Sequence, residues 1–250
     1  MRGDGLLKVC VNGSRTLADH PRLSSDAGDI AAEAAAGIAA GAAAVHVHAK
    51  SSGGRDSLLG TDVGRVLSAI RAACPGVPVG VTTGAWAAPE ASDRIAAITS
   101  WRILPDFASV NWHEDGADEV AGALLAHGIG IEVGIWHERG LTAWAASPHR
   151  SSCLRALIEI QPDELLPVDS VAERLIGGVE SREPELPILL HGEGTTAWPV
   201  LDLAAAWGYA TRIGLEDTLV LPDGLPAESN SELVAEAVRR LASTCVPARV

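Results

Sequence analysis

Two histidines, His46 and His48, stand one residue apart in the apolar run Ala44–Lys50 (AVHVHAK). Successive side chains of a β-strand point to opposite faces, so both imidazoles point to the same side. The run Ala210–Asp217 (ATRIGLED) carries a third candidate ligand, Glu216. If these runs are the second and eighth strands of a closed barrel, one strand separates them. Their backbones then lie roughly 10 Å apart, and inward side chains reach one ion.

His46, His48 and Glu216 form the ligand set of a catalytic zinc ion that keeps one position open for water or substrate. Non-haem iron uses the same set, so we expect Zn²⁺ and keep Fe²⁺ or another divalent metal as alternatives. The other interpretation of the two histidines is that their imidazoles are satisfied by hydrogen bonds within the core. The facing position of Glu216 favours the metal site.

Asp217 follows Glu216 directly and points the other way unless the strand has already ended. At the rim of a barrel, its carboxylate is free to turn toward the metal and to act as a general base beside a polarised carbonyl. Arg212, one layer deeper, would stabilise developing negative charge. The alternative is an ion pair of Arg212 with Asp217 or Glu216 that only stiffens the barrel.

Small hydrogen-bonding residues stand near the ends of neighbouring strands, together with one acidic residue, Glu132. Such a set, with backbone N–H groups at a glycine turn, would hold a substrate carboxylate without a second arginine. Strand-end Ser, Thr and Asn residues also cap the helices that follow, and this alternative stays open. The candidates for substrate binding are Thr82, Thr83, Gly84, Ser109 and Asn111.

The elements that would position these residues alternate along the chain. Period-two or continuous apolar runs predict strands, and amphipathic, Ala-rich segments between them predict helices. The strands are expected within residues 6–13, 44–50, 77–84, 106–112, 128–136, 164–170, 186–194 and 210–217. The helices are expected over residues 29–40, 62–73, 91–100, 117–126, 152–160, 171–180, 197–207 and 232–242.

Eight β-then-α units in 250 residues predict a (β/α)8 TIM barrel, expected as a single domain over residues 1–250. An open doubly wound sheet usually has fewer strands. The carboxyl ends of the barrel strands, where such folds place their chemistry, carry polar residues in this sequence. These residues are Asn12, His48, Thr83, Asn111, Trp136, Asp169, Glu193, and Glu216 or Asp217.

Composition excludes several other classes of protein. The net charge of −13 disfavours nucleic acid and anionic membrane surfaces as partners. No apolar run approaches the length of a membrane span, and the N-terminus lacks a secretory signal, so we expect a cytoplasmic protein without membrane contact. The four cysteines are far apart and predict neither disulfides nor a cysteine zinc cluster. Dinucleotide and P-loop glycine motifs are absent.

Several segments resemble the β-keto acid cleavage enzymes, a family of zinc-dependent barrels that includes the 3-keto-5-aminohexanoate cleavage enzyme. The similarity lies in His20–His48, Asp93–Asn111 and Ala210–Val234, together with the short motifs VTTG and GIEVGIW. It extends over well over half of the chain. The combination of HxH with RxGxED at these positions is specific to the family, whereas either motif alone would not be.

The resemblance implies zinc at His46, His48 and Glu216, a general base at Asp217, and charge stabilisation by Arg212. It further implies that the substrate carboxylate binds at the five small residues named above, and that Glu132 acts in the pocket. The reaction would condense a β-keto acid with an acyl-CoA, usually acetyl-CoA, and cleave the adduct to acetoacetate and a new CoA thioester. The family also implies a homo-oligomer, a dimer or a tetramer.

Two other functions stay open at the level of sequence. The same metal and barrel could serve a hydrolase or aldolase of a small carboxylate that does not use CoA. A barrel of this kind could also bind a small acid without catalysis, as a metabolic sensor. Metal content and consumption of CoA separate these three functions.

Overall fold

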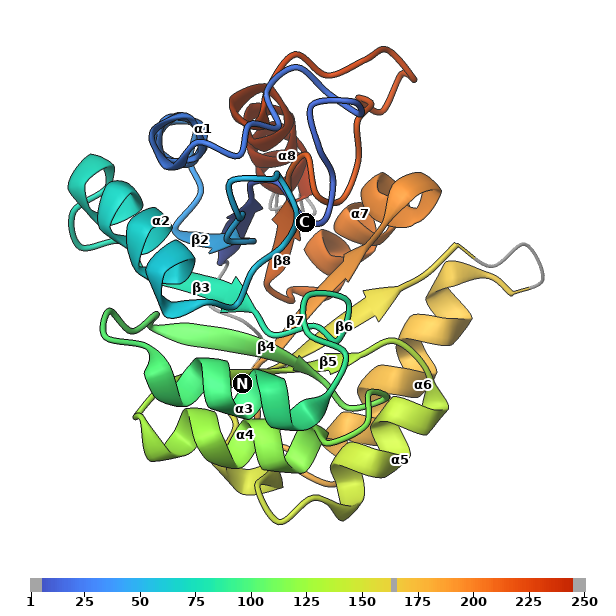
Figure 1. The fold of residues 1–250 in the computed structure, drawn as a ribbon. Coiled ribbons are helices and arrows are strands. Elements are labelled where there is room, and N and C mark those ends of the chain that lie inside the picture. Colours follow the sequence, from blue (N-terminus) through green and yellow to red (C-terminus); the bar gives the residue numbers. More distant parts are fainter. Residues whose placement is uncertain (1–5, 163–165, 245–250) are drawn as a thin grey trace.

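The computed structural model describes residues 6–162 and 166–244 (Figure 1). Strands and helices alternate through these residues, as expected. The strands are β1 (Leu7–Cys10), β2 (Ala44–Val47), β3 (Val79–Thr82), β4 (Phe107–Asn111), β5 (Gly130–Ile135), β6 (Arg155–Ile160), β7 (Ile188–Gly192) and β8 (Thr211–Ile213). The helices are α1 (Ala27–Ala39), α2 (Gly60–Ala73), α3 (Ala91–Ser100), α4 (Ala117–Ala126), α5 (Glu138–Ala146), α6 (Val168–Glu180), α7 (Ala197–Trp207) and α8 (Asn230–Thr244), with 3-10 turns at Arg150–Ser152 and Gly194–Thr196.

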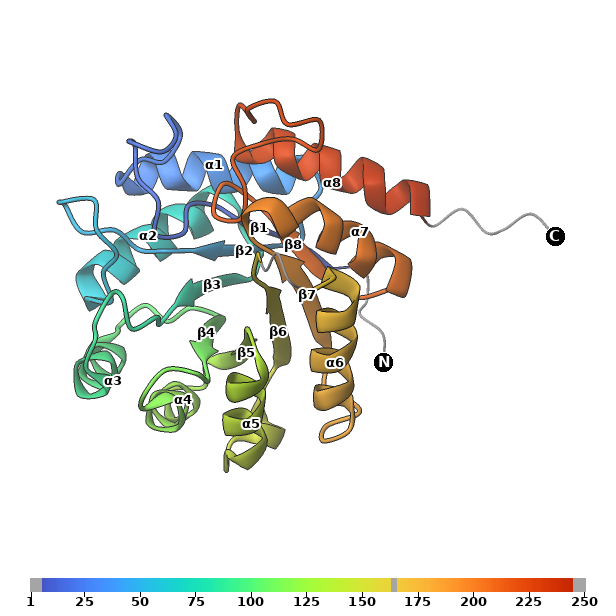
Figure 2. The ribbon, with the colours of Figure 1, turned by 90° about the vertical axis from the view of Figure 1, so that its right-hand side faces the viewer.

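The strands form one parallel sheet in the order β7-β6-β5-β4-β3-β2-β1-β8. Its two ends meet, because the Leu190 amide donates to the Ala210 carbonyl at 2.9 Å and Thr211 Oγ1 donates to the Leu190 carbonyl at 2.8 Å. The sheet is thereby a nearly closed barrel, with the helices around the strands (Figure 2). The expected (β/α)8 barrel is confirmed.

The helices lie against the barrel through small and branched side chains. On α1, Gly37 lies so close to β1 that an added Cβ would stand 2.8 Å from a methyl group of Val9. Asp26 begins this helix by accepting hydrogen bonds from the amides of Gly28 and Asp29, which satisfies donors that a first turn leaves free. Figure 2 shows α1 and α8 side by side, and Asn230 Nδ2 joins them by donating to Glu33 Oε2 at 3.1 Å.

A cluster of ionic side chains lies in the lower layer of the barrel interior, that is, toward the amino ends of the strands and below the carboxyl ends. Lys8 Nζ lies 2.5 Å from Glu132 Oε2, and Arg155 Nε lies 3.3 Å from the other carboxylate oxygen. Both cations also approach the Phe107 ring, whose centre is 5.2 Å from Lys8 Nζ and 5.8 Å from the Arg155 guanidinium carbon. Glycine is required at position 80, because an added Cβ would stand 1.9 Å from that ring.

One part of the predicted pattern is wrong. The sixth strand is β6, within residues for which a helix was expected, whereas the strand expected at residues 164–170 is replaced by the approach to α6 and its first turn. Residues 164 and 165 lie outside the described residues. Helix α5 was not expected at all. A parallel strand buried on both faces shows no alternation, so a short apolar run does not distinguish it from a helix.

Two other expectations concern features that do not shape the site. None of the helices in residues 6–162 and 166–244 is long and apolar enough to cross a membrane. Within the same residues Cys10, Cys74 and Cys153 are free thiols, the first two buried and the third half-buried. Cys245 lies outside the described residues.

The G80A substitution is expected to destabilise the barrel, because the new methyl group must displace the Phe107 ring from a packed interior. Overpacking of this kind costs about 1–3 kcal/mol of unfolding free energy. Urea denaturation measures the loss. The matched control is G177A on α6, where an added Cβ meets nothing within 4 Å. Equal midpoints for the two variants would contradict the packing argument.

Candidate functional site

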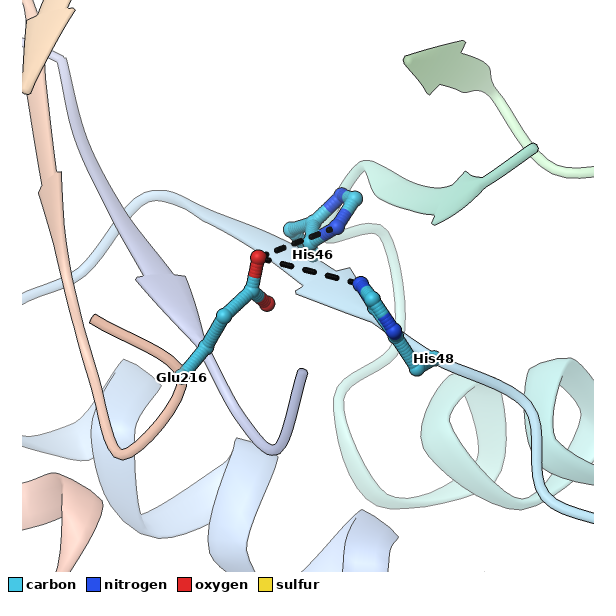
Figure 3. A group of neighbouring side chains, drawn as sticks. All are labelled: His46, His48 and Glu216. Carbon is cyan, nitrogen blue, oxygen red and sulfur yellow. Dashed lines mark ion pairs between the residues drawn. The ribbon is translucent and has the colours of Figure 1, made fainter. Parts of the chain in front are cut away.

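A cavity of about 170 Å³ opens at the carboxyl ends of the barrel strands. His46 from β2, His48 just after it and Glu216 from the loop after β8 converge on its wall (Figure 3). Glu216 Oε1 lies 3.6 Å from His46 Nε2 and 3.7 Å from His48 Nε2. The structure therefore brings the three predicted metal ligands to one point.

Hydrogen bonds from β1 hold the two histidines in place. Asn12 Nδ2 donates to the His48 carbonyl at 2.9 Å, and Asn12 Oδ1 accepts from the His48 amide at the same distance. This pair of bonds continues the β1–β2 register, in which Cys10 stands beside His46, beyond the end of the strands. His48 therefore keeps strand-like alternation, and both imidazoles face the cavity.

Glu216 reaches the histidines because β8 ends early. The chain turns after Ile213, and the Asp217 amide donates to the Gly214 carbonyl at 2.9 Å. Only glycine fits at position 214, because an added Cβ would stand 2.0 Å from the Cys10 carbonyl oxygen. Asn230 Oδ1 fixes the turn by accepting from the Leu215 amide at 2.9 Å.

Gly13 leaves room for the Glu216 side chain. Its φ of +57° is readily available only to glycine, and an added Cβ would stand 2.6 Å from Glu216 Cγ. Asn230 also donates to the Val11 carbonyl at 3.0 Å and so ties the β8 turn to β1. No role was predicted for Asn230, although it lies in Ala210–Val234, one of the segments that resemble the family.

Asp56 orients His48 from behind. Its Oδ2 lies 2.7 Å from His48 Nδ1 and accepts from the Trp86 indole at 2.8 Å, and its Oδ1 accepts from Lys50 Nζ at 2.6 Å. Burial opposes ionisation of Asp56, yet the hydrogen bond with His48 and the charge of Lys50 lower its pKa. A carboxylate on the far nitrogen directs the other nitrogen to a metal. The glycine-rich loop around Asp56 carries no sequence signal for this role.

The three ligands fit a divalent cation on several grounds. For bonds of roughly 2.1 Å, tetrahedral ligand atoms stand about 3.4 Å apart, close to the separations found here. Burial lowers the pKa of His46, which keeps its imidazole neutral. Burial opposes the ionisation of Glu216, but Arg212 and the two imidazoles bring its pKa down to about 2. His46 and Glu216 are thus held in the protonation states that metals bind.

One orphaned atom supports the same conclusion. Among the described residues, Glu216 Oε2 is buried without a hydrogen-bond partner, whereas Oε1 of the same carboxylate faces both imidazoles. Buried polar atoms in native proteins are nearly always paired, so this ligand carboxylate keeps an oxygen that the described chain does not satisfy. Which divalent metal would bind stays a prediction, with zinc first.

Arg212 connects the metal ligand to the expected base. Its Nη2 donates to Glu216 Oε1 at 3.0 Å and to Asp217 Oδ1 at 2.7 Å, and its Nε lies 3.1 Å from the same Asp217 oxygen. Burial raises the pKa of Asp217 to about 7, against the opposing effect of Arg212. Asp217 Oδ2 is buried without a partner in the described part of the chain. The ion pairs considered as the alternative for Arg212 therefore both exist, and they position the two carboxylates.

The candidate substrate-binding residues divide into two groups. Thr82, Ser109 and Asn111 line the cavity, as expected. Thr83 does not, because it turns away and its Oγ1 donates to the Ser109 carbonyl at 2.7 Å. Gly84 shapes the mouth instead of lining it: an added Cβ would stand 2.3 Å from the Trp86 ring.

Glu132 lies elsewhere than expected. It faces the barrel interior, but its carboxylate pairs with Lys8 and Arg155 in the ion cluster below, and it is not among the residues that line the cavity. The prediction that Glu132 lies in the pocket is therefore wrong. Both of its carboxylate oxygens already face cations, so neither oxygen is directed at a substrate.

Three charged residues of the cavity wall were not predicted to lie there: Arg15, Glu159 and Glu193. Glu193 was noted only as a strand-end residue. Glu159 was hidden because β6 was taken for a helix, which made Asp169 appear to end the sixth strand. Asp169 lies instead in the exposed first turn of α6. Recognising residues 155–160 as a doubly buried strand would have placed Glu159 at its end.

The fold and the site define a (β/α)8 barrel with a candidate divalent-metal centre at the carboxyl ends of its strands. The family model described as beta-keto acid cleavage enzyme matches residues 6–121 and 132–246. The chain belongs to this family, and the resemblance seen in the sequence is confirmed.

Two relatives named 3-keto-5-aminohexanoate cleavage enzyme come from Fusobacterium nucleatum subsp. nucleatum and Acetoanaerobium sticklandii. Each is 22% identical, and the alignments cover 94% of this chain and 90% of each relative. Among solved structures, the binary complex of ObcA with oxaloacetate has a TM-score of 0.72 at 17% identity and covers 89% of this chain. This chain spans 64% of the length of ObcA.

A second solved structure shares the fold only. Type I 3-dehydroquinate dehydratase from Clostridium difficile has a TM-score of 0.65 at 14% identity, over 97% of this chain and 94% of its own. At these sequence identities, the two solved structures establish only that this chain has the barrel fold. The chemistry has to be inferred from the site itself.

The D56N substitution is expected to weaken metal binding about 10- to 100-fold, because an amide orients His48 less strongly than a carboxylate does. Competition with a chromophoric chelator measures the zinc affinity. D169N, an exposed change in α6, is the control and leaves affinity unchanged. Wild-type affinity in D56N would mean that Asp56 does not support the metal site.

Glu159 predicts a specific pH dependence of stability. Burial raises its pKa to about 8, against about 4.5 when the chain is unfolded. Between these values the folded chain holds a proton that the unfolded chain has lost, so this residue makes the unfolding free energy fall as the pH rises. E159Q removes the effect. Its stability relative to the wild type is expected to grow by on the order of 3 kcal/mol from about pH 5 to about pH 8.

Urea denaturation of both metal-free proteins across this range measures the difference. E185Q changes an exposed carboxylate in the loop before β7 and serves as the control. A stability difference between E159Q and the wild type that does not vary with pH would contradict the assignment.

Proposed function

We propose that this protein condenses a β-keto acid with an acyl-CoA, usually acetyl-CoA, and cleaves the adduct to acetoacetate and a new CoA thioester. The acyl part of the keto acid leaves on CoA, and the acetyl group takes its place, so all atoms are accounted for. The observation that carries the proposal is the meeting of His46, His48 and Glu216 beside the Arg212–Asp217 pair in a barrel of this family.

The residues of the cavity divide the work. Thr82, Ser109 and Asn111 line one side and offer hydroxyl and amide groups to the substrate carboxylate. A divalent cation, zinc by preference, held by His46, His48 and Glu216 would polarise the keto oxygen. These positions would fix the keto acid with its reacting carbons over the cavity floor.

Asp217 would take the proton that leaves the carbon between the carboxylate and the keto group. Its Oδ2 has no partner in the described residues, so the proton has a free oxygen to receive it. Arg212 holds the other oxygen and adds positive charge beside the carbanion that forms. The carbanion would attack the thioester carbonyl, and the CoA thiolate would leave. The thiolate would then attack the original keto carbon of the adduct, and the bond from that carbon to the central carbon would break. The resulting acetoacetate carbanion would take its proton back from Asp217.

The acyl-CoA needs a path into a cavity that is itself only large enough for a small acid. A groove of about 620 Å³ adjoins it, and Ser14 and Trp86 line both. Arg55 lines the groove with an exposed side chain, for which the described residues supply no ion-pair partner. A structure of ObcA is described as a ternary complex with a C4-CoA adduct and oxalate, which supports the use of a CoA substrate.

The direct test is to incubate the zinc-loaded protein with acetyl-CoA and a panel of β-keto acids and to measure acetoacetate. H46A and E216A are expected to lose at least about a hundredfold in activity, because each removes a ligand. C153A, which changes a thiol outside the cavity, is expected to retain it. Activity that survives both H48A and E216A would overturn the proposal.

The same assay distinguishes the alternatives. Lactone hydrolysis or aldol cleavage without loss of CoA thioester would select the CoA-independent enzyme. Substoichiometric metal after gentle purification, with no turnover, would select a barrel that only binds a small acid. The cytoplasmic location, the single domain and the homo-oligomeric state stay predictions from the sequence.

R55E is expected to raise the KM for acetyl-CoA about tenfold, because it places a negative charge where the CoA phosphates would pass. The KM for the keto acid should not change. A thioester of N-acetylcysteamine, which lacks the phosphates, is the internal control and should react equally well with both proteins. R102E, an exposed change in the loop before β4, is the control variant. An unchanged KM for acetyl-CoA in R55E would exclude this path.

A further inference from the structure

Trp86 stands between the cavity and the groove that adjoins it. The residue lies in the loop of residues 83–90, between β3 and α3, and it lines both spaces. It is 46% exposed, an unusual position for so large an apolar side chain. An indole combines a flat apolar face with a single N–H donor at its edge. Both the face and the edge of Trp86 have a defined contact with the metal site.

The face of the indole lies against the ligand His48. The two ring centres are 5.9 Å apart and the ring planes differ by 14°, which is the geometry of an offset stack. Stacking resists rotation of the imidazole about its Cβ–Cγ bond, because a turned ring would lose this contact. The hydrogen bond between His48 Nδ1 and Asp56 Oδ2 fixes the direction of the ring within its plane. Different neighbours therefore hold the face and the edge of His48.

The edge of the indole holds Asp56. Trp86 Nε1 donates to Asp56 Oδ2 at 2.8 Å, and the same oxygen lies 2.7 Å from His48 Nδ1. Lys50 Nζ donates to the other oxygen, Oδ1, at 2.6 Å. With a donor from outside the imidazole on each oxygen, the carboxylate does not rotate away from His48 without breaking a hydrogen bond. Trp86 thus acts on the metal ligand through Asp56.

The loop after β3 fixes the place of the indole. An added Cβ at Gly84 would stand 2.3 Å from the Trp86 ring, so the ring packs directly on the backbone there. The Ala87 amide donates to the Gly84 carbonyl at 3.1 Å, and the Ala85 amide donates to Glu114 Oε2 at 2.9 Å. These bonds hold the chain on both sides of Trp86. The position of the ring is therefore built into the fold, although half of the ring is exposed.

We propose that Trp86 is a positioning residue with two separable effects. Its indole N–H holds Asp56 on His48 and thereby strengthens the metal site. Its ring forms the wall along which the acyl end of a thioester passes from the groove into the cavity. The first effect needs no substrate, whereas the second rests on the proposed function. If Trp86 only fills space, zinc affinity does not depend on the N–H donor.

Zinc affinity tests the first effect without turnover. W86F keeps an aromatic ring but removes the N–H donor, and it is expected to weaken zinc binding about tenfold in competition with a chromophoric chelator. G84A keeps the indole but forces it from its place, so it is expected to weaken zinc binding as well. G53A is the matched control, because Gly53 is exposed and an added Cβ meets only Ser51 Oγ, at 3.9 Å. Wild-type zinc affinity in W86F would overturn the proposal.

A double-mutant cycle shows whether Trp86 acts through Asp56. D56A removes the carboxylate, so the indole N–H has no acceptor left to hold. In the D56A background, W86F is therefore expected to change zinc affinity by less than about twofold, against about tenfold in the wild type. Because Trp86 is half-exposed, W86F should keep the melting temperature of the zinc-free protein. Equal losses of zinc affinity in both backgrounds would show that Trp86 does not act through Asp56 and would overturn the proposal.

Kinetics at saturating zinc test the second effect. W86A removes the wall and is expected to raise the KM for acetyl-CoA about tenfold, the effect of losing one aromatic contact, whereas W86F stays within about twofold of the wild type. The KM for the N-acetylcysteamine thioester should rise equally in W86A, because the ring would contact the acyl end and not the phosphates. A lower kcat with an unchanged KM in W86A would overturn this effect.

The two measurements distinguish failure of this inference from failure of the proposed function. Zinc affinity that depends on the indole N–H only while Asp56 is present would support the first effect even if no acetoacetate formed. Acetoacetate formation by W86F and W86A with the zinc affinity and the KM values of the wild type would overturn the inference and leave the proposed function standing.

Discussion

The site depends on one buried guanidinium. Arg212 is inserted between two consecutive carboxylates and a histidine, and its contacts set the position of each. Removing a charge of this kind from water is costly unless hydrogen bonds and opposite charges satisfy it. Here Glu216, Asp217 and His191 do so from the β8 turn and from β7, where the barrel closes. The candidate chemistry is therefore tied to closure of the barrel.

Three buried carboxylates around this arginine have different properties because their neighbours differ. The imidazoles and Arg212 together keep the pKa of Glu216 at about 2, whereas burial raises that of Asp217 to about 7 and that of Glu159 to about 8. One carboxylate is thereby suited to bind a metal, one is suited to exchange a proton near neutrality, and the third keeps its proton at neutral pH. Separation of acid strengths by environment is how a single cavity assigns different roles to like groups.

The barrel keeps its charges in two layers. Below, Lys8, Arg155 and Glu132 neutralise one another around Phe107 and leave nothing for a ligand. Above, the carboxylates that line the cavity outnumber the arginines. The lower layer holds the strands together, while the upper layer carries the three candidate metal ligands.

The sequence by itself determined the local and periodic features. Alternation along the second strand put His46 and His48 on one face, the repeated units predicted the barrel, and the facing run Ala210–Asp217 supplied Glu216, Asp217 and Arg212, as the resemblance also implied. The predictions of strand face and of the barrel are possible because both follow from local rules: side chains alternate along a strand, and strands and helices alternate along the chain.

Only the tertiary structure decided contacts between distant segments. Asn230 at the β8 turn and Glu132 in the ion cluster each depend on a partner far along the chain, and no spacing encodes such pairs. Asp56 is close to His48 in the chain, but only the path of the loop between them brings its carboxylate behind the imidazole. Glu159 was out of reach for a different reason: its strand is buried on both faces, so hydrophobic periodicity, the signal on which the prediction relied, is absent there.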